Sequence, residues 1–107
     1  MPSHIIVSVA GPVEGRETEF HEWYETVHVP EVLALPQFIR AVRYAPRDSL
    51  EGLSPGPTGH MTIFEVEAPD VSQALGTLSD ALPSLTMSDS LDLATAHVRA
   101  YEFVGSW

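Results

Sequence analysis

Hydrophobic and polar residues recur along the chain with two periods, and each change of period marks an expected element. Residues 3–10 alternate at every second position, which is typical of a strand. From about residue 16 the period becomes helical, with apolar and aromatic side chains at i, i+3, i+4 and i+7: Phe20, Trp23, Tyr24 and Val27. We expect this helix to end or kink at Val29 and Pro30, because proline lacks a donor and restricts the residue before it. Residues 31–35 then form a short extra turn, which proline can begin.

The remainder of the chain alternates strands with a second helix. Residues 38–44 and 60–67 are predicted as the second and third strands, and residues 93–104 as a long final strand. Asp70 is a suitable N-cap for the second helix. Residues 47–59 are rich in Pro, Gly, Ser and Asp, and a loop of this length is a candidate lid over a pocket.

The order strand–helix–strand–strand–helix–strand predicts a single α+β domain over residues 1–107 with a ferredoxin-like architecture. Its four-stranded antiparallel sheet has both helices on one face. The other face is then bare, and the register decides which apolar side chains it carries, among them Ile6, Val42, Phe64 and Val66. An exposed apolar sheet needs a partner, and we expect a face-to-face homodimer.

Composition narrows the classes of function. Fifteen acidic residues stand against five basic ones, and the formal net charge is -10. Such a surface repels phosphate backbones and anionic headgroups, so we expect neither nucleic acid nor a membrane as a partner. The chain has no cysteine, which excludes disulfides and thiolate catalysis, and no lysine for a Schiff base. Without a membrane-spanning run or a secretory signal pattern, a cytoplasmic location is expected.

One segment of the chain resembles a known superfamily. It reads Trp23-Tyr24-x-x-x-His28-x-Pro30-Glu31-Val32-Leu33, then Leu35-Pro36-x-Phe38 and Arg40-Ala41-x-Arg43-Tyr44. With the element order, it is similar to the dimeric α/β-barrel superfamily and, within it, to the EthD-like branch. The resemblance implies two ferredoxin-like protomers that join their sheets into a barrel, with a small-molecule pocket between helices and sheet in each. Members include cofactor-independent isomerases, polyketide cyclases, monooxygenases and haem-dependent enzymes, so the fold alone does not choose a function.

His28 leads the candidate catalytic residues. On a helix it lies beside Tyr24 at the edge of the apolar stripe, where its ring can turn into the cleft between helix and sheet. We expect carbonyls at the end of the first helix to favour its imidazolium form. A histidine that titrates near neutrality suits proton transfer beside a carbonyl group. The alternative is a helix cap that holds Pro30. Tyr24 is expected to aim its hydroxyl into the same pocket, and Trp23, a core residue of the stripe, to border it.

Polar side chains on three strands are candidate contacts to a substrate. The set comprises His97, Arg99 and Tyr101 on the final strand, Arg40 and Tyr44 on the second, and His60 on the third. If these faces look into the pocket of His28, His97 would orient or polarise a substrate oxygen and an arginine would hold an anionic group. If they do not, the row on the final strand faces water at an edge of the sheet. The register decides between the two, and the alternation of residues does not give it.

The first helix contains one candidate metal site. His21, Glu25 and His28 stand at i, i+4 and i+7, and two imidazoles with a carboxylate can ligate iron or zinc. However, His21 and Glu25 fall on the polar side of the helix among other acidic residues. The glycines of the 47–59 loop show no phosphate-binding pattern. We therefore expect neither a metal nor a cofactor.

These expectations combine into one leading hypothesis and its rivals. The leading hypothesis is a cofactor-independent acid/base enzyme, of isomerase, cyclase or lyase type, that acts on a small cyclic or polyketide-like carbonyl compound. His28 is the acid/base, Tyr24 and His97 orient an oxygen, and Arg40 or Arg99 anchors an anionic group. The rivals are a cofactor-free or haem-dependent oxygenase of the same fold, a non-catalytic small-molecule binding module, and a subunit that serves another enzyme.

Overall fold

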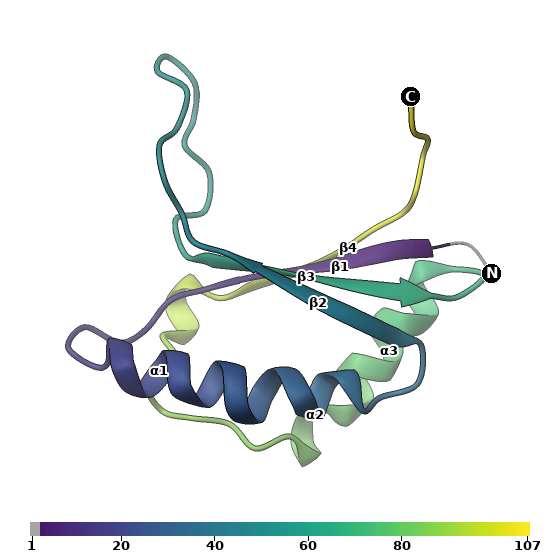
Figure 1. Ribbon diagram of the computed structural model, residues 1–107, viewed down its shortest axis with the longest axis horizontal. Coiled ribbons are helices and arrows are strands. Elements are labelled where there is room, and N and C mark those ends of the chain that lie inside the picture. The colour runs from purple at the N-terminus through teal and green to yellow at the C-terminus, as the bar shows by residue number, and fades with distance from the viewer. Residues whose placement is uncertain (1–2) are drawn as a thin grey trace.

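The computed structural model of the chain describes residues 3–107 (Figure 1). Four strands and the helices follow in the predicted order. The bounds are β1 Ser3–Ala10, α1 Glu17–Trp23, a π-helical turn Tyr24–His28, α2 Val29–Leu33, β2 Phe38–Tyr44, β3 His60–Glu67, α3 Val71–Ala81 and β4 His97–Tyr101. Short 3-10 turns at Leu82–Ser84 and Leu93–Thr95 flank the connection from α3 to β4.

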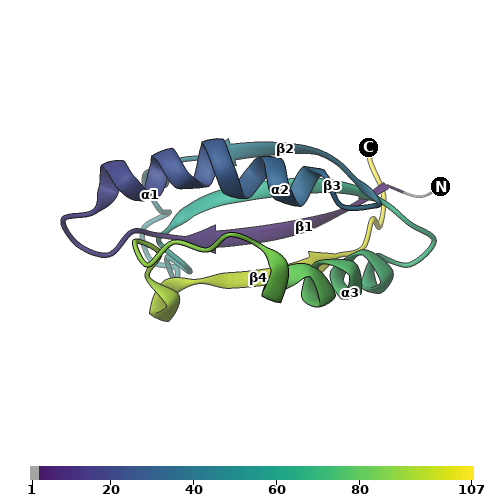
Figure 2. The same cartoon turned by 90° about the horizontal axis from the view of Figure 1, so that it is seen from below.

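The sheet is antiparallel throughout and its strands lie in the order β2-β3-β1-β4. Figures 1 and 2 show the helices together on one face of it, while the opposite face is bare. The predicted α+β layer with four antiparallel strands and an edge position for the final strand is confirmed. Within residues 3–107, no helix is long and apolar enough to cross a membrane.

The register of the strands shows which side chains face the helices and which lie on the bare face, a question that the sequence alone does not answer. One row across the sheet, from β2 to β4, faces the helices: Ala41, Phe64, Ile6 and Ala100. Ile6, Phe64 and Val66 are almost fully buried there, against Ala74 and Leu78 of α3. The neighbouring row lies on the bare face: Val42, Ile63, Val7 and Arg99. Of the four apolar residues considered for the bare face, only Val42 lies on it.

The prediction for Val29 and Pro30 was an end or a kink of the first helix, and of these two the end is wrong. The backbone stays helical from α1 through the π-helical turn into α2, with Pro30 in the first turn of α2. The N–H of Val29 bonds the carbonyl of Tyr24, five residues back. A π-turn displaces the carbonyls that the ring of Pro30 would otherwise meet, so the helix accommodates the proline without a break.

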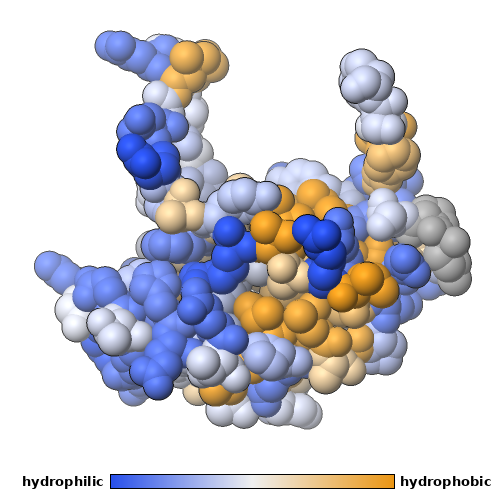
Figure 3. Space-filling view, in the orientation of Figure 1, coloured by the Kyte–Doolittle hydropathy of each residue, from blue (hydrophilic) through white to orange (hydrophobic). Residues whose placement is uncertain are grey.

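The end of the chain also differs from the prediction. The expected strand over residues 93–104 shortens to β4, because Asp92 caps a 3-10 turn by accepting a bond from the N–H of Ala94 (3.0 Å). After β4, residues 102–107 leave the sheet. Residues 45–59 likewise project from the sheet as an arm. Figure 3 shows both projections on the side away from the helices, each with hydrophobic atoms on its surface.

Candidate functional site

A cavity of about 210 Å³ lies between the helices and the sheet. Its walls come from every layer of the fold, because β1, β3, the π-helical turn, α3 and the connection to β4 all contribute. The lining residues are almost all apolar: Ile6, Ala10, Trp23, Val32, Phe64, Leu78, Leu82, Met87, Leu91, Leu93, Ala96 and Val98. Three side chains bring polar atoms to it, namely Ser8, Tyr24 and His28. The cavity therefore has an apolar lining with a small polar group of residues.

Ser8 and Tyr24 form the fixed part of this polar group. Tyr24 is buried, at 3% exposure, and its hydroxyl donates a hydrogen bond to Oγ of Ser8 at 3.3 Å. The guanidinium of Arg43 lies over the outer face of the Tyr24 ring, 4.4 Å from its centroid. The phenol is thus held between a strand serine and a cation, which fixes the direction of its hydroxyl.

His28 is the titratable group of the cavity. Its ring stacks on Trp23 with centroids 4.8 Å apart and meets Tyr24 edge-on at 5.0 Å. Its Nδ1 atom is buried and has no hydrogen-bond partner. Burial lowers the pKa of His28 from its ordinary value of 6.5, and the negative charge of Glu31 opposes this only in part. The expectation that a helix end favours the imidazolium is wrong, because the helix continues past His28 and desolvation favours the neutral ring.

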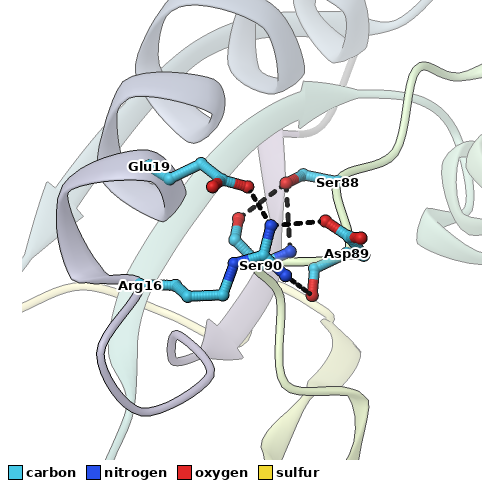
Figure 4. A network of polar contacts seen from close by, with 5 residues as sticks. All are labelled: Arg16, Glu19, Ser88, Asp89 and Ser90. Atoms are coloured by element: carbon cyan, nitrogen blue, oxygen red, sulfur yellow. Dashed lines mark hydrogen bonds and ion pairs between the residues drawn. The ribbon is translucent and has the colours of Figure 1, made fainter.

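The connection between α3 and β4 forms one wall of the cavity, and ion pairs and hydrogen bonds hold it in place. Glu31 accepts bonds from the N–H and the hydroxyl of Thr86, at 2.8 and 2.9 Å, and the Trp23 indole donates to the Thr86 carbonyl at 2.8 Å. Further along, Arg16 pairs with Glu19 and with Asp89, the latter at 2.7 Å (Figure 4). The same ion pair lowers the pKa of Asp89. The segment that carries Met87 and Leu91 is therefore bonded to residues at both ends of the continuous helix formed by α1, the π-helical turn and α2.

His60 and Arg43 lie next to the cavity but outside it. Arg43 pairs with Glu25 at 2.9 Å and contacts Nδ1 of His21 at 3.4 Å, and the His21 and His60 rings lie 4.6 Å apart. Burial, and then the charges of His21 and Arg43, lower the pKa of His60. His21 and Glu25 thus bind a cation of the protein itself, while His28 points elsewhere. In the part of the chain that the structure describes, no three His, Cys, Asp or Glu side chains gather as a metal site.

The remaining candidates lie on the bare face, away from His28. His97, Arg99 and Tyr101 border a separate groove of about 340 Å³ with Val7 and Val9. Two further candidates lie on β2 on the same face. Arg40 pairs with Glu65 at 3.0 Å, and Tyr44 is half exposed. The condition under which His97 and an arginine would join His28 in one pocket is therefore not met within a single chain. Nor does the 45–59 arm cover the cavity, since its Pro57 borders the groove instead.

Of the predicted site residues, the structure brings Trp23, Tyr24 and His28 together around one cavity. Sequence reasoning did not assign a role to Ser8, although its signal was visible as a hydroxyl between Ile6 and Ala10 on one face of an apolar strand. It also missed Arg43, whose place over Tyr24 depends on the register of β2. Met87 and Leu91 carried no periodic signal, because they belong to an irregular segment.

Comparison with known proteins adds no relative: no protein-family model, curated protein or solved structure matches the chain. The site must therefore be interpreted from its own geometry. That geometry provides an apolar chamber, one neutral imidazole without a partner for Nδ1, and one phenol hydroxyl with a fixed direction.

Proposed function

We propose that the protein is a proton-transfer enzyme that acts without a cofactor on a small, uncharged cyclic carbonyl compound. One observation carries the proposal. His28 lines an apolar cavity with its Nδ1 buried and unpaired, in an environment that lowers its pKa. A neutral imidazole held beside an apolar cavity is a competent general base at neutral pH, because no proton has to be removed from it first.

The size and lining of the cavity support an apolar ligand. A dry cavity of about 150 Å³ holds one benzene molecule, so the observed volume of about 210 Å³ suits one substituted ring or two fused rings. None of the lining residues is charged apart from the titratable His28. Arg40 and Arg99 lie on the other face of the sheet and do not anchor a ligand in this cavity, so the ligand need not be an anion.

His28 and Tyr24 have different roles in the proposed reaction. His28 takes a proton from the carbon next to the carbonyl, and the electron pair of that C–H bond moves into the enolate. To act on the enolate, Tyr24 exchanges its bond to Oγ of Ser8 for one to the enolate oxygen, and the Ser8 hydroxyl donates to the Tyr24 oxygen in return. The new hydrogen bond stabilises the developing charge. The imidazolium then returns the proton to the same or to a neighbouring carbon, which gives exchange or isomerisation with no net consumption of protons.

The bare face supports the further proposal of a homodimer whose two sheets pack face to face, as in a dimeric α/β barrel. Two rows of its outward side chains are mainly apolar: Val42, Ile63 and Val7 in one, and Tyr44, Met61 and Val9 in the other. A partner would remove this surface from water. Size-exclusion chromatography with light scattering tests this directly, and a monomer at about 100 μM would contradict it.

Deuterium exchange tests the proposed chemistry without knowledge of the natural substrate. Cyclic ketones and 1,3-diketones of one or two rings are incubated in D₂O with the protein, and deuterium uptake next to the carbonyl is followed by mass spectrometry. We expect at least one compound to exchange faster than in buffer. His28→Gln should slow that exchange about 100-fold or more. His21→Gln, on the same helix but outside the cavity, is the matched control and should keep the rate.

Other outcomes of this experiment are informative. Exchange that His28→Gln leaves intact would refute the assigned role of His28. Consumption of dissolved oxygen with the same compounds would instead indicate an oxygenase. The nearly uniform apolar lining also favours a second candidate, a binding module without turnover. Tight binding of a ring compound with no exchange in any assay would support that candidate over the enzyme.

A further inference from the structure

Two segments project from the bare side of the sheet (Figures 1 and 3). One is the 45–59 arm and the other is the segment of residues 102–107, here called the tail. Both carry exposed apolar side chains, with Leu50 and Leu53 on the arm and Val104 and Trp107 on the tail. Trp107 is fully exposed. A fully exposed tryptophan indicates a surface that is buried elsewhere.

The tail leaves the sheet from a fixed point. The backbone N–H of Phe103 donates a hydrogen bond to Nδ1 of His4 at 2.9 Å, and His4 is itself buried on β1. The direction of the tail is thus set at its base, and only the residues beyond Phe103 extend from the body. Trp107 is held on the same side as the bare face, at the end of the sheet where β4 finishes.

The bare face contains a groove of the type that receives such a side chain. Val7 and Val9 contribute its apolar part, Pro57 of the arm borders it, and Arg99 and Tyr101 of β4 complete it, within a volume of about 340 Å³. Arg99 forms no ion pair with any residue in the described range 3–107. An apolar groove with an unpaired guanidinium is suited to an indole ring, which can stack on the cation while it covers the valines.

Charge favours a second copy of this chain as the source of that ring. The outward positions of the four strands carry Arg40 and Arg99 against Glu65 and Glu67, so their formal charges cancel. The whole chain, in contrast, carries -10. Two acidic copies repel each other over most of their surfaces, and the neutral face is where they can approach.

A face-to-face dimer with one particular two-fold axis would bring the tail of each copy to the groove of the other. The tail leaves at the Tyr101 end of β4, and the groove runs along this strand to His97 and Pro57 at its other end. A two-fold axis that runs parallel to the sheets and across their strands exchanges the two ends. The tail of each copy then points at the groove of the other.

We propose that Trp107 of one copy fills the groove of its partner, between Val7, Val9 and Arg99. The inference rests on the homodimer proposed above and names the contact that holds it. Each dimer contains two such contacts, related by symmetry. The contact and His28 lie on opposite faces of the sheet. A test of the contact is therefore independent of a test of the proton-transfer chemistry.

The two tryptophans of the chain make the contact measurable. In Trp23→Phe, the only remaining indole is that of Trp107. We expect its emission to be blue-shifted and protected from acrylamide at concentrations where light scattering gives a dimer. On dilution to the monomer, both properties should revert to those of an indole in water. If Trp23→Phe does not fold, fluorine NMR of the chain labelled with fluorotryptophan, assigned with Trp107→Phe, reports the same change.

Three results would overturn the proposal. A dimer in which Trp107 remains accessible to acrylamide would show that the tail does not dock, while the dimer itself would stand. Protection that persists in the monomer would place the ring on its own chain. A chain that stays monomeric would remove the docking and the dimer together, but would leave the exchange assay unaffected.

Substitution of the ring gives an independent test of the same contact. Trp107→Ala should raise the dimer dissociation constant about 30-fold or more, as expected for an aromatic anchor. Trp107→Phe should recover part of the loss, because it restores an aromatic ring of smaller area. Equal dissociation constants for the wild type and Trp107→Ala would overturn the proposal.

Discussion

The imidazole of His28 lies 4.8 Å from the indole of Trp23, centroid to centroid, with only 26° between the two rings. This stacking presents one face of the imidazole to an aromatic surface and removes it from water. The other consequence is electrostatic, because burial makes the neutral form of His28 the favoured one. The stacking on Trp23 therefore favours the unprotonated form of His28 beside the cavity.

The protonation of His28 should be visible in the fluorescence of Trp23. In Trp107→Phe, Trp23 is the only indole and can be excited selectively over the tyrosines. An imidazolium stacked on an indole quenches its emission more strongly than a neutral imidazole does. We expect the emission to fall on acidification with a midpoint below the ordinary pKa of 6.5. His28→Gln in the same background should abolish the titration. A midpoint at or above 6.5 would contradict the environment described for this ring.

The free energy of unfolding should depend on pH, and the lowered pKa of His28 sets the direction of the change. The lowered pKa of His28 in the folded state means that the unfolded chain binds the proton first as pH falls through 6.5. Stability is therefore full above about pH 7 and declines below it, until the folded pKa is reached. His60 has the same direction of shift and adds to the decline. Urea unfolding of His28→Gln at about pH 5 and about pH 8 should show a smaller difference than wild type.

Gly59 should tolerate no side chain. A Cβ at this position would lie 2.7 Å from the carbonyl carbon and oxygen of Ala10, which are backbone atoms at the end of β1. We expect Gly59→Ala to destabilise the fold by about 1–3 kcal/mol. Gly76, inside α3, has nothing within 4 Å of the corresponding position. Gly76→Ala should stabilise the fold by about 1 kcal/mol, and thermal unfolding of the two variants should give shifts of opposite sign.

The two aspartates at opposite ends of α3, Asp70 and Asp80, should contribute differently to the stability of the fold. The side chain of Asp70 accepts a bond from the N–H of Ser72 at 2.9 Å. Asp70→Ala should therefore cost about 1 kcal/mol of stability. Asp80 lies in the last turn of the same helix, where a negative charge opposes the helix dipole. Asp80→Ala should be neutral or slightly stabilising, and chemical denaturation that ranked the two variants the other way would contradict the capping role.

The element order was predictable because local chemistry agreed with the fold along most of the chain. The strands β1, β2 and β3 have the predicted bounds, and Asp70 caps α3 as expected. The aromatic stripe of the first helix is buried, including Phe20 and Trp23. These features depend on periodicity and on side chains that act within a few residues, which a sequence shows directly.

The composition of the site was less predictable, because it depends on relations between distant segments. The alternation of residues in β4 correctly predicted that His97 and Val98 lie on opposite faces of the strand. Only the pairing with β1 shows that Val98 faces the cavity and His97 does not. Met87 reaches the cavity from an irregular segment that Arg16 and Glu31 hold from other elements. No local pattern encodes such contacts.

The π-helical turn has a consequence for angular position around the helix axis. In an α-helix, residues five apart are separated by about 140° around the axis, since each residue turns by about 100°. Trp23 and His28 are five apart, and in a regular helix they would point in different directions. The wider turn at Tyr24–His28 bonds residues five apart and brings those two positions onto one side. The contact between the indole and the imidazole is thus a property of one irregular turn, and the proline that follows it is part of the same local arrangement.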